Sequence, residues 1–245
     1  MGETTLIHLS RMIALQRKLD MTAQNVANAD TGGFRARQLS FQEYLKPEKG
    51  VDDRGKKERA VSLVDPRFQF NEVKQGALQQ TGNPLDLAID GEGYFVVQTA
   101  EGERYTRVGA LTIDSRGGIV TLAGQAVLGK NGPLQGPLNE GDVNVSADGT
   151  IATKRAVFGQ LRLVRFARPE LLQPAGGTLL RSDQPLVESS GEVRVVSGAI
   201  EKSNVQTMRE MGRLAEITRS YEMVGRLLKN SQDVDDINKL GNVPD

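Results

Sequence analysis

Both ends of the 245-residue chain have the pattern of an amphipathic helix, and a glycine-rich middle separates them. From Thr5 to Asn28 the sequence contains neither glycine nor proline. Its apolar residues recur at helical steps, which places them on one broad face; they are Leu6, Leu9, Met12, Ile13, Leu15, Leu19 and Val26. Gly32-Gly33 then ends the predicted helix, because glycine readily adopts the backbone angles that stop one.

A second helix is predicted near the C-terminus, with Ser203 or Asn204 as its N-cap. Its apolar residues follow steps of three and four, the spacing of a coiled-coil seam, at Leu214, Ile217, Tyr221, Val224 and Leu228. This spacing fits an ordinary packed helix as well. Gly212 and Gly225 each weaken a helix by roughly 1 kcal/mol relative to alanine, so the segment needs a packing partner.

The middle of the chain has the pattern of an antiparallel β domain. Short apolar runs alternate with polar turns over residues 85–195, and most of the 27 glycines lie at these turns. Asp148-Gly149 predicts a two-residue hairpin turn between two such runs. The charged segment 46–62 predicts a loop or a partly disordered connection.

These patterns together predict an α+β fold with an antiparallel β-rich central domain and a long helix at each terminus. The expected divisions are a terminal helical domain of residues 1–33 and 203–245, extended or loop connections at 34–84 and 196–202, and a central β domain at 85–195. Neither helix can bury its apolar face alone. The helices can pair with each other or with neighbouring copies, and docking on the β domain would bury the same faces.

Composition argues against several classes of function. The chain has 31 basic and 31 acidic residues and therefore lacks the positive excess of a nucleic-acid-binding surface. No run approaches the ~20 apolar residues that cross a bilayer, and the first residues do not form a cleavable signal peptide. Without cysteine, and with His8 as the one histidine, the usual zinc and transition-metal sites lack ligands. We expect no nucleic acid, no membrane insertion, no metal and no cofactor.

No set of residues predicts catalysis. Asp86 and Asp90 suggest a carboxylate pair, but a strand's polar face and a turn explain them better. Gly91-Glu92-Gly93 lacks the third glycine and the helix of a dinucleotide site. Residues 114–118 contain too few acidic residues for a calcium loop. The sequence therefore predicts a protein that is not an enzyme.

The string from Asn25 to Arg35 resembles the signature of the flagellar axial proteins, which include rod, hook and hook-associated proteins. In that family an asparagine-rich helix end is followed by Thr, usually Pro, and then Gly, Phe and a basic residue. Gly32 stands here in place of the usual Pro. Further blocks that resemble the family follow in its order at residues 82–95, 105–111, 198–205 and 219–222.

Within this family, the chain resembles a proximal-rod protein more than the distal-rod protein, both in its length and in residues 127–133. Its tail, residues 241–245, differs from the usual end of both proteins. The resemblance implies a structural subunit of the flagellar basal-body rod, exported by the flagellar type III apparatus without a cleavable signal peptide. Its implied partners are copies of itself, neighbouring proximal-rod and distal-rod proteins, and the export apparatus. The subunits would form a helical shaft that transmits motor torque to the hook, with the terminal helices paired as coiled coils.

We predict that the residues of the assembly interface lie on the two helix faces and in the signature string. They are Leu15, Leu19, Val26, Asn28, Phe34, Leu214, Ile217, Tyr221, Val224 and Leu228. The alternatives are the distal-rod protein, a secreted adhesin or carbohydrate-binding β domain, and a hydrolase that uses Asp86 and Asp90.

Overall fold

The computed structural model describes residues 3–47, 60–136, 143–189 and 193–240, and the chain divides into two compact units. The first, called here the helical unit, comprises Met1–Ala27, Arg37–Gln69 and Gln206–Asp245. The second, called here the β unit, comprises Asn28–Ala36 and Phe70–Val205. The predicted combination of two terminal helices with an antiparallel β-rich middle is confirmed.

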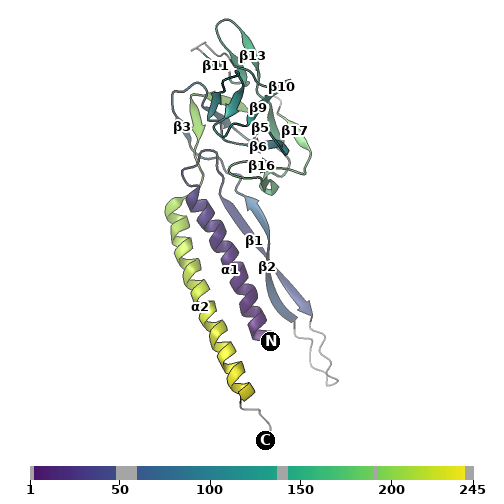
Figure 1. The fold of residues 1–245 in the computed structure, drawn as a ribbon, viewed down its shortest axis with the longest axis vertical. Helices are drawn as coiled ribbons and strands as arrows, with labels where there is room; N and C mark the ends of the chain where they lie inside the picture. The colour runs from purple at the N-terminus through teal and green to yellow at the C-terminus, as the bar shows by residue number, and fades with distance from the viewer. Residues whose placement is uncertain (1–2, 48–59, 137–142, 190–192, 241–245) are drawn as a thin grey trace. The chain divides into compact units, whose positions relative to one another are not determined.

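The helical unit contains α1, Glu3–Ala27, and α2, Thr207–Leu240, which lie side by side and run in opposite directions (Figure 1). Ala14 and Met21 of α1 and Ile217 and Val224 of α2 are buried. The Tyr221 hydroxyl donates a hydrogen bond to Oε1 of Gln16, 3.3 Å away. The two helices therefore bury apolar side chains against each other within one chain, which is one of the arrangements that the sequence left open.

Two strands, β1, Arg37–Pro47, and β2, Ala60–Asn71, form a two-stranded sheet. Most of both strands lies in the helical unit, and β1 lies beside α1 (Figure 1). This is regular structure where the sequence predicted a connection over 34–84. Of the predicted loop 46–62, residues 46–47 and 60–62 belong to these strands, and 48–59 lie outside the described residues. The charged residues of 46–62 favoured the prediction of a loop. On either side of them, polar and apolar residues alternate, which is typical of strands.

The β unit contains short strands and one 3₁₀ turn, and all its described strand pairs are antiparallel. The strands are β3 Leu78–Gln80, β4 Leu87–Asp90, β5 Tyr94–Thr99, β6 Gly102–Thr106, β7 Leu111–Ile113, β8 Ile119–Thr121, β9 Ala126–Gly129, β10 Gly132–Pro133, β11 Asn144–Val145, β12 Thr150–Ala152, β13 Val157–Gln160, β14 Leu163–Phe166, β15 Gln173–Pro174, β16 Leu180–Arg181, β17 Leu186–Glu188, β18 Arg194–Ser197 and β19 Ala199–Glu201, and the 3₁₀ turn is Pro169–Leu171. The main sheet has the order β15-β16-β6-β5-β9-β8-β7, with β10 beside β9 and β14 between β5 and β17.

Strand β5 contributes side chains to both apolar clusters of the β unit, because both of its faces are buried. Phe95 and Val97 pack into one apolar cluster, and Tyr94 and Val96 pack into the other. A strand that is covered on both sides has a continuous apolar run rather than an alternation, as Tyr94-Phe95-Val96-Val97 does. Most other core side chains are aliphatic, which fits an aromatic content of 4%.

The predicted hairpin at Asp148-Gly149 is present, with a longer turn than expected. Strands β11 and β12 pair through Val145 and Ile151, and the Gly149 amide donates to the Ser146 carbonyl at 2.8 Å. Gly149 has φ +82°, which fits the αL position of a three-residue loop better than a two-residue turn.

Strand β18 begins in the predicted β domain 85–195 and ends in the predicted connection 196–202, and strand β19 lies within that connection. Strand β18 pairs with β4 and strand β19 pairs with β3. α2 then begins at Thr207, so neither Ser203 nor Asn204 is its N-cap. The Asn204 side chain instead accepts a hydrogen bond from the Ala36 amide at 2.7 Å and donates one to the Lys74 carbonyl at 2.8 Å. The start of α2 corrects both capping predictions, and the contacts of Asn204 show how its side chain is used instead.

Candidate functional site

The predicted helix-face residues are already partly covered within the chain. Ile217 and Val224 are 4% and 5% exposed. The other predicted side chains of the two helices are half-buried: Leu15, Leu19, Val26, Leu214, Tyr221 and Leu228. Packing between α1 and α2 therefore uses much of the face that the sequence assigned to assembly.

A second set of apolar side chains on the helical unit is exposed, and the sequence did not assign these residues to the interface. Leu6, Leu9 and Ile13 of α1 are 47%, 41% and 48% exposed, and Met223 and Leu227 of α2 are 65% and 46% exposed. We call these five residues the outer apolar patch. The contact between Gln16 and Tyr221 places the first turns of α1 near the level of these α2 residues. The spacing of Leu6, Leu9 and Ile13 by three and four residues is the sequence signal from which the α1 part of this patch could have been predicted.

A groove of about 260 Å³ lies beside Ile217 in the helical unit. Its charged residues include Arg213 and Glu210, which form an ion pair at 2.7 Å although Glu210 is only 4% exposed. Arg37 also lines the groove, and burial lowers the pKa of its guanidinium. The groove therefore places charged side chains next to Ile217, a residue of the predicted seam.

The two signature residues, Asn28 and Phe34, belong to the β unit. The Asn28 carbonyl accepts a hydrogen bond from the Thr31 amide at 3.1 Å, and its side-chain oxygen accepts one from the Thr31 hydroxyl at 3.2 Å. Phe34 is 4% exposed. Asn28 and Phe34 therefore belong to a different unit from the predicted helix-face residues.

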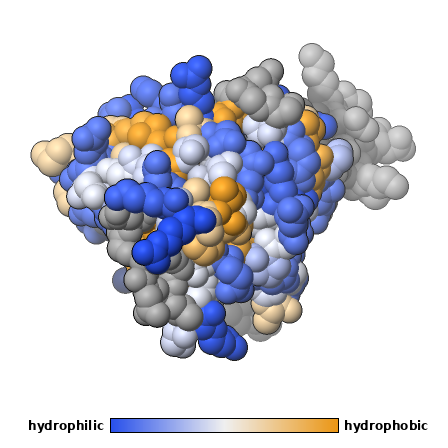
Figure 2. All heavy atoms as spheres, turned by 90° about the horizontal axis from the view of Figure 1, so that it is seen from above, coloured by the Kyte–Doolittle hydropathy of each residue, from blue (hydrophilic) through white to orange (hydrophobic). Residues whose placement is uncertain are grey.

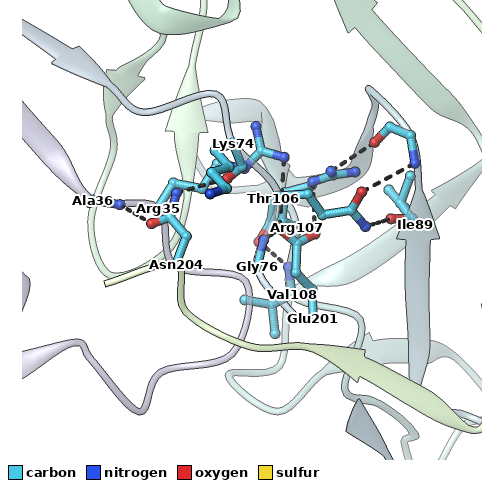
Figure 3. A network of polar contacts seen from close by, with 12 residues as sticks. Arg35, Ala36, Lys74, Gly76, Ile89, Thr106, Arg107, Val108, Glu201 and Asn204 are labelled. Carbon is cyan, nitrogen blue, oxygen red and sulfur yellow. Dashed lines mark hydrogen bonds and ion pairs between the residues drawn. The ribbon is translucent and has the colours of Figure 1, made fainter. Parts of the chain in front are cut away.

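The β unit holds a buried ionic cluster, which we define as Arg35, Arg107 and Glu201 (Figure 3). Arg107 Nε lies 3.0 Å from one carboxylate oxygen of Glu201, and Arg35 Nη2 lies 3.7 Å from the other. The side chains of Arg107 and Glu201 are each 1% exposed and that of Arg35 is 7% exposed. Three segments far apart in the sequence therefore meet at one carboxylate.

Burial and the proximity of two cations dominate the electrostatics of this cluster. Burial, followed by the charge of Arg35, lowers the pKa of Arg107 to about 10. Both guanidinium carbons lie 5.8 Å from the ring centroid of Tyr94, within range of cation–π attraction. Burial raises the pKa of the Tyr94 hydroxyl.

Two backbone amides donate to Glu201. The Gly76 amide donates to the carboxylate oxygen Oε1 at 3.1 Å (Figure 3). The Gly33 amide donates to the main-chain carbonyl of Glu201 at 2.8 Å. Gly33 has φ +67°, and a Cβ there would lie 2.6 Å from the Val108 nitrogen. A side chain at Gly33 would therefore prevent this close approach.

An apolar hollow of about 660 Å³ also lies in the β unit, between the turns at 121–125 and 175–179. Glu201 is the one ionisable residue among those that line it, and its carboxylate is engaged by Arg107. The described part of the chain contains no group of three or more His, Cys, Asp or Glu residues that could hold a metal ion. None of its described helices is long and apolar enough to cross a membrane.

Comparison with known proteins matches three parts of the chain to family models. Residues 6–35 match "Flagella basal body rod protein", residues 88–153 match "Flagellar hook protein FlgE/F/G D1 domain", and residues 196–240 match "Flagellar basal body rod FlgEFG protein C-terminal". The FlgF rod protein of Caulobacter vibrioides is 34% identical, over 96% of this chain and 95% of its own length. The chain belongs to the flagellar basal-body rod protein family.

Other members of the rod protein family support the same assignment. FlgF of Mesorhizobium japonicum is 30% identical over 96% of both chains, and FlgG of Bacillus subtilis is 28% identical over 92% of this chain and 94% of its own. The prediction of a structural rod protein of the flagellar basal body, more similar to FlgF than to FlgG, is confirmed. Each of the three matched regions contributes one member of the ionic cluster: Arg35, Arg107 and Glu201.

Proposed function

We propose that this rod protein is a subunit of the proximal rod that joins copies of itself and neighbouring rod proteins through the outer apolar patch. The observation that carries this proposal is the exposure of Leu6, Leu9, Ile13, Met223 and Leu227 on two helices that already pack together. Apolar side chains left uncovered in this arrangement mark a surface for another protein. With 31 basic and 31 acidic residues, the chain lacks the positive excess that a nucleic-acid-binding surface would need.

Burial of the patch would favour assembly. Covering the exposed half of a leucine or isoleucine side chain contributes about 1 kcal/mol at ~25 cal/mol per Å². Five such side chains per subunit, repeated along a helical polymer, offset part of the entropy lost when subunits associate. The assembled subunits would form the shaft that transmits motor torque to the hook. The flagellar type III apparatus would export each subunit before assembly.

The change Ile13→Asp tests the role of the patch. Ile13 is 48% exposed, so the charged side chain stays hydrated in the free subunit and the α1–α2 packing is retained. In the polymer the carboxylate would be buried without a partner, which costs several kcal/mol. We expect motility to be lost in a strain that carries only this variant, while the purified variant keeps the helix content of the unmodified protein by circular dichroism.

Thr218→Asp is the matched control. Thr218 is an exposed polar residue of α2 outside the patch, and its hydroxyl donates only within the helix, to Leu214 at 2.9 Å. We expect this strain to swim. A motile Ile13→Asp strain would contradict the proposed interface.

The proximal position in the rod is tested separately by complementation. The chain should restore motility to a strain that lacks FlgF and not to one that lacks FlgG.

A further inference from the structure

The ionic cluster holds two cations and one anion in a site that is buried from bulk solvent. Arg35 and Arg107 share the carboxylate of Glu201, and all three side chains are at most 7% exposed. Glu92 also favours the charged form of Arg107, but its side chain is exposed and its influence ranks below that of Glu201. Among the described residues, Arg35 Nε and Arg107 Nη1 have no hydrogen-bond acceptor, and Arg107 Nε and Glu201 Oε2 meet as an ion pair without hydrogen-bond geometry. Glu201 is therefore the carboxylate that compensates both guanidinium groups.

The two arginines differ in how firmly the rest of the β unit holds them. Arg107 follows strand β6, and its Nη2 donates to the Gly91 carbonyl at 2.8 Å. Arg35 lies in Asn28–Ala36, a segment of the β unit that contains no strand. If the carboxylate is lost, the segment that carries Arg35 can leave without breaking a strand of the main sheet.

Glu201 and Asn204 connect this segment to two others. Glu201 accepts from Gly33 through its carbonyl and from Gly76 through its carboxylate. Asn204 accepts from Ala36 and donates to Lys74. The Glu201 and Asn204 side chains therefore join residues 33–36 and 74–76 to residues 201–204 (Figure 3). Two backbone hydrogen bonds, from the Gly33 amide to the Glu201 carbonyl and from the Asn204 amide to the Phe34 carbonyl, add to this connection.

We propose that Glu201 makes the docking of the two ends of the β unit mutually dependent: residues 28–36 stay docked only when residues 199–204 are in place. Without the carboxylate, two guanidinium groups would face each other in a buried site, and neither would be compensated. With it, the segment that follows α1 and the segment that precedes α2 are fixed beside each other. Under the proposed function, on which this consequence rests, the cluster would hold together the two β-unit segments that are continuous in sequence with the assembly helices.

Hydrogen–deuterium exchange on the purified full chain tests this coupling. In Glu201→Gln the shape of the side chain is kept and its charge is removed. We expect the amides of 31–36 and of 74–76 to exchange at least tenfold faster, while β5 keeps its protection. The matched control is Glu188→Gln, which removes a 54% exposed carboxylate paired with Arg162 at 2.8 Å and should change neither segment. Unchanged exchange at 31–36 in Glu201→Gln, or an equal increase in β5, would overturn the proposal.

A double variant tests the charge argument and does not require Glu201→Gln to be stable. Alone, Arg35→Met should lower the urea midpoint, because it removes a partner of Glu201. In the Glu201→Gln background the same change should raise the midpoint, because it removes one of two uncompensated cations. If Glu201→Gln does not fold, recovery of folding in the double variant supports the proposal and failure to recover contradicts it. The same direction of change in both backgrounds would also contradict it. These measurements use the free protein, so their result is independent of the motility test.

Discussion

At the residue scale, the ring of Tyr94 lies beside both guanidinium groups of the ionic cluster. Burial raises the pKa of its hydroxyl above the ordinary value of 10.0, so the folded protein keeps this proton in alkali where the unfolded chain loses it. This contribution to stability is complete below pH 10 and is lost as the pH rises through the folded pKa. Arg107 acts in the opposite direction, because its pKa is lowered to about 10 and the folded state releases that proton first.

The prediction from Tyr94 is spectroscopic. An absorbance titration of tyrosinate should show a component above pH 10, to which Tyr105 also contributes since burial raises its pKa as well. Tyr94→Phe should remove part of that component and keep the rest. An unchanged late component in Tyr94→Phe would show that Tyr94 titrates as an exposed tyrosine does.

The sequence did not single out the three members of the cluster, and it could not predict that they meet. Arg35, Arg107 and Glu201 each lie in a block that resembles the flagellar family. Helical and strand periodicities relate neighbours in the chain, and no periodicity relates residues 35, 107 and 201. The pairing of β19 with β3 brings Glu201 beside Gly76, and the sequence Leu78-Gln79-Gln80 gives no apolar signal for that strand.

At the scale of elements, the glycines of α2 lower its stability without any packing role in the free chain. An added Cβ at Gly212 would meet nothing within 4 Å. Gly212→Ala should therefore stabilise α2 by about 1 kcal/mol through helix propensity, measured as slower amide exchange in α2. The same substitution at Gly33 should destabilise the β unit, because the Cβ would lie 2.6 Å from the Val108 nitrogen at a φ of +67°. A loss of protection in Gly212→Ala would mean that this glycine is packed.

The two helices could be predicted from the sequence, whereas strands β1 and β2 and the start of α2 could not. Both helices were predicted because each repeats an apolar step over several turns without proline. Strands β1 and β2 were missed because the charges of 46–62 suggested a loop. The start of α2 was placed too early because Asn204, a good N-cap residue by type, uses its side chain to join Ala36 and Lys74.

At the scale of the whole molecule, the division into a helical unit and a β unit predicts that damage to one leaves the other folded. Ile217 is 4% exposed in the helical unit, and Ile217→Asp would bury an unpaired charge there at a cost of several kcal/mol. We expect exchange to accelerate over 5–27 and 207–230 and to stay slow over β4 and β5, whose apolar residues fill the separate core of the β unit. Motility should be lost as well. Ile13→Asp separates the two effects, because it should abolish motility with slow exchange in both units. Acceleration over β5 in Ile217→Asp would instead show that the two units fold as one cooperative body.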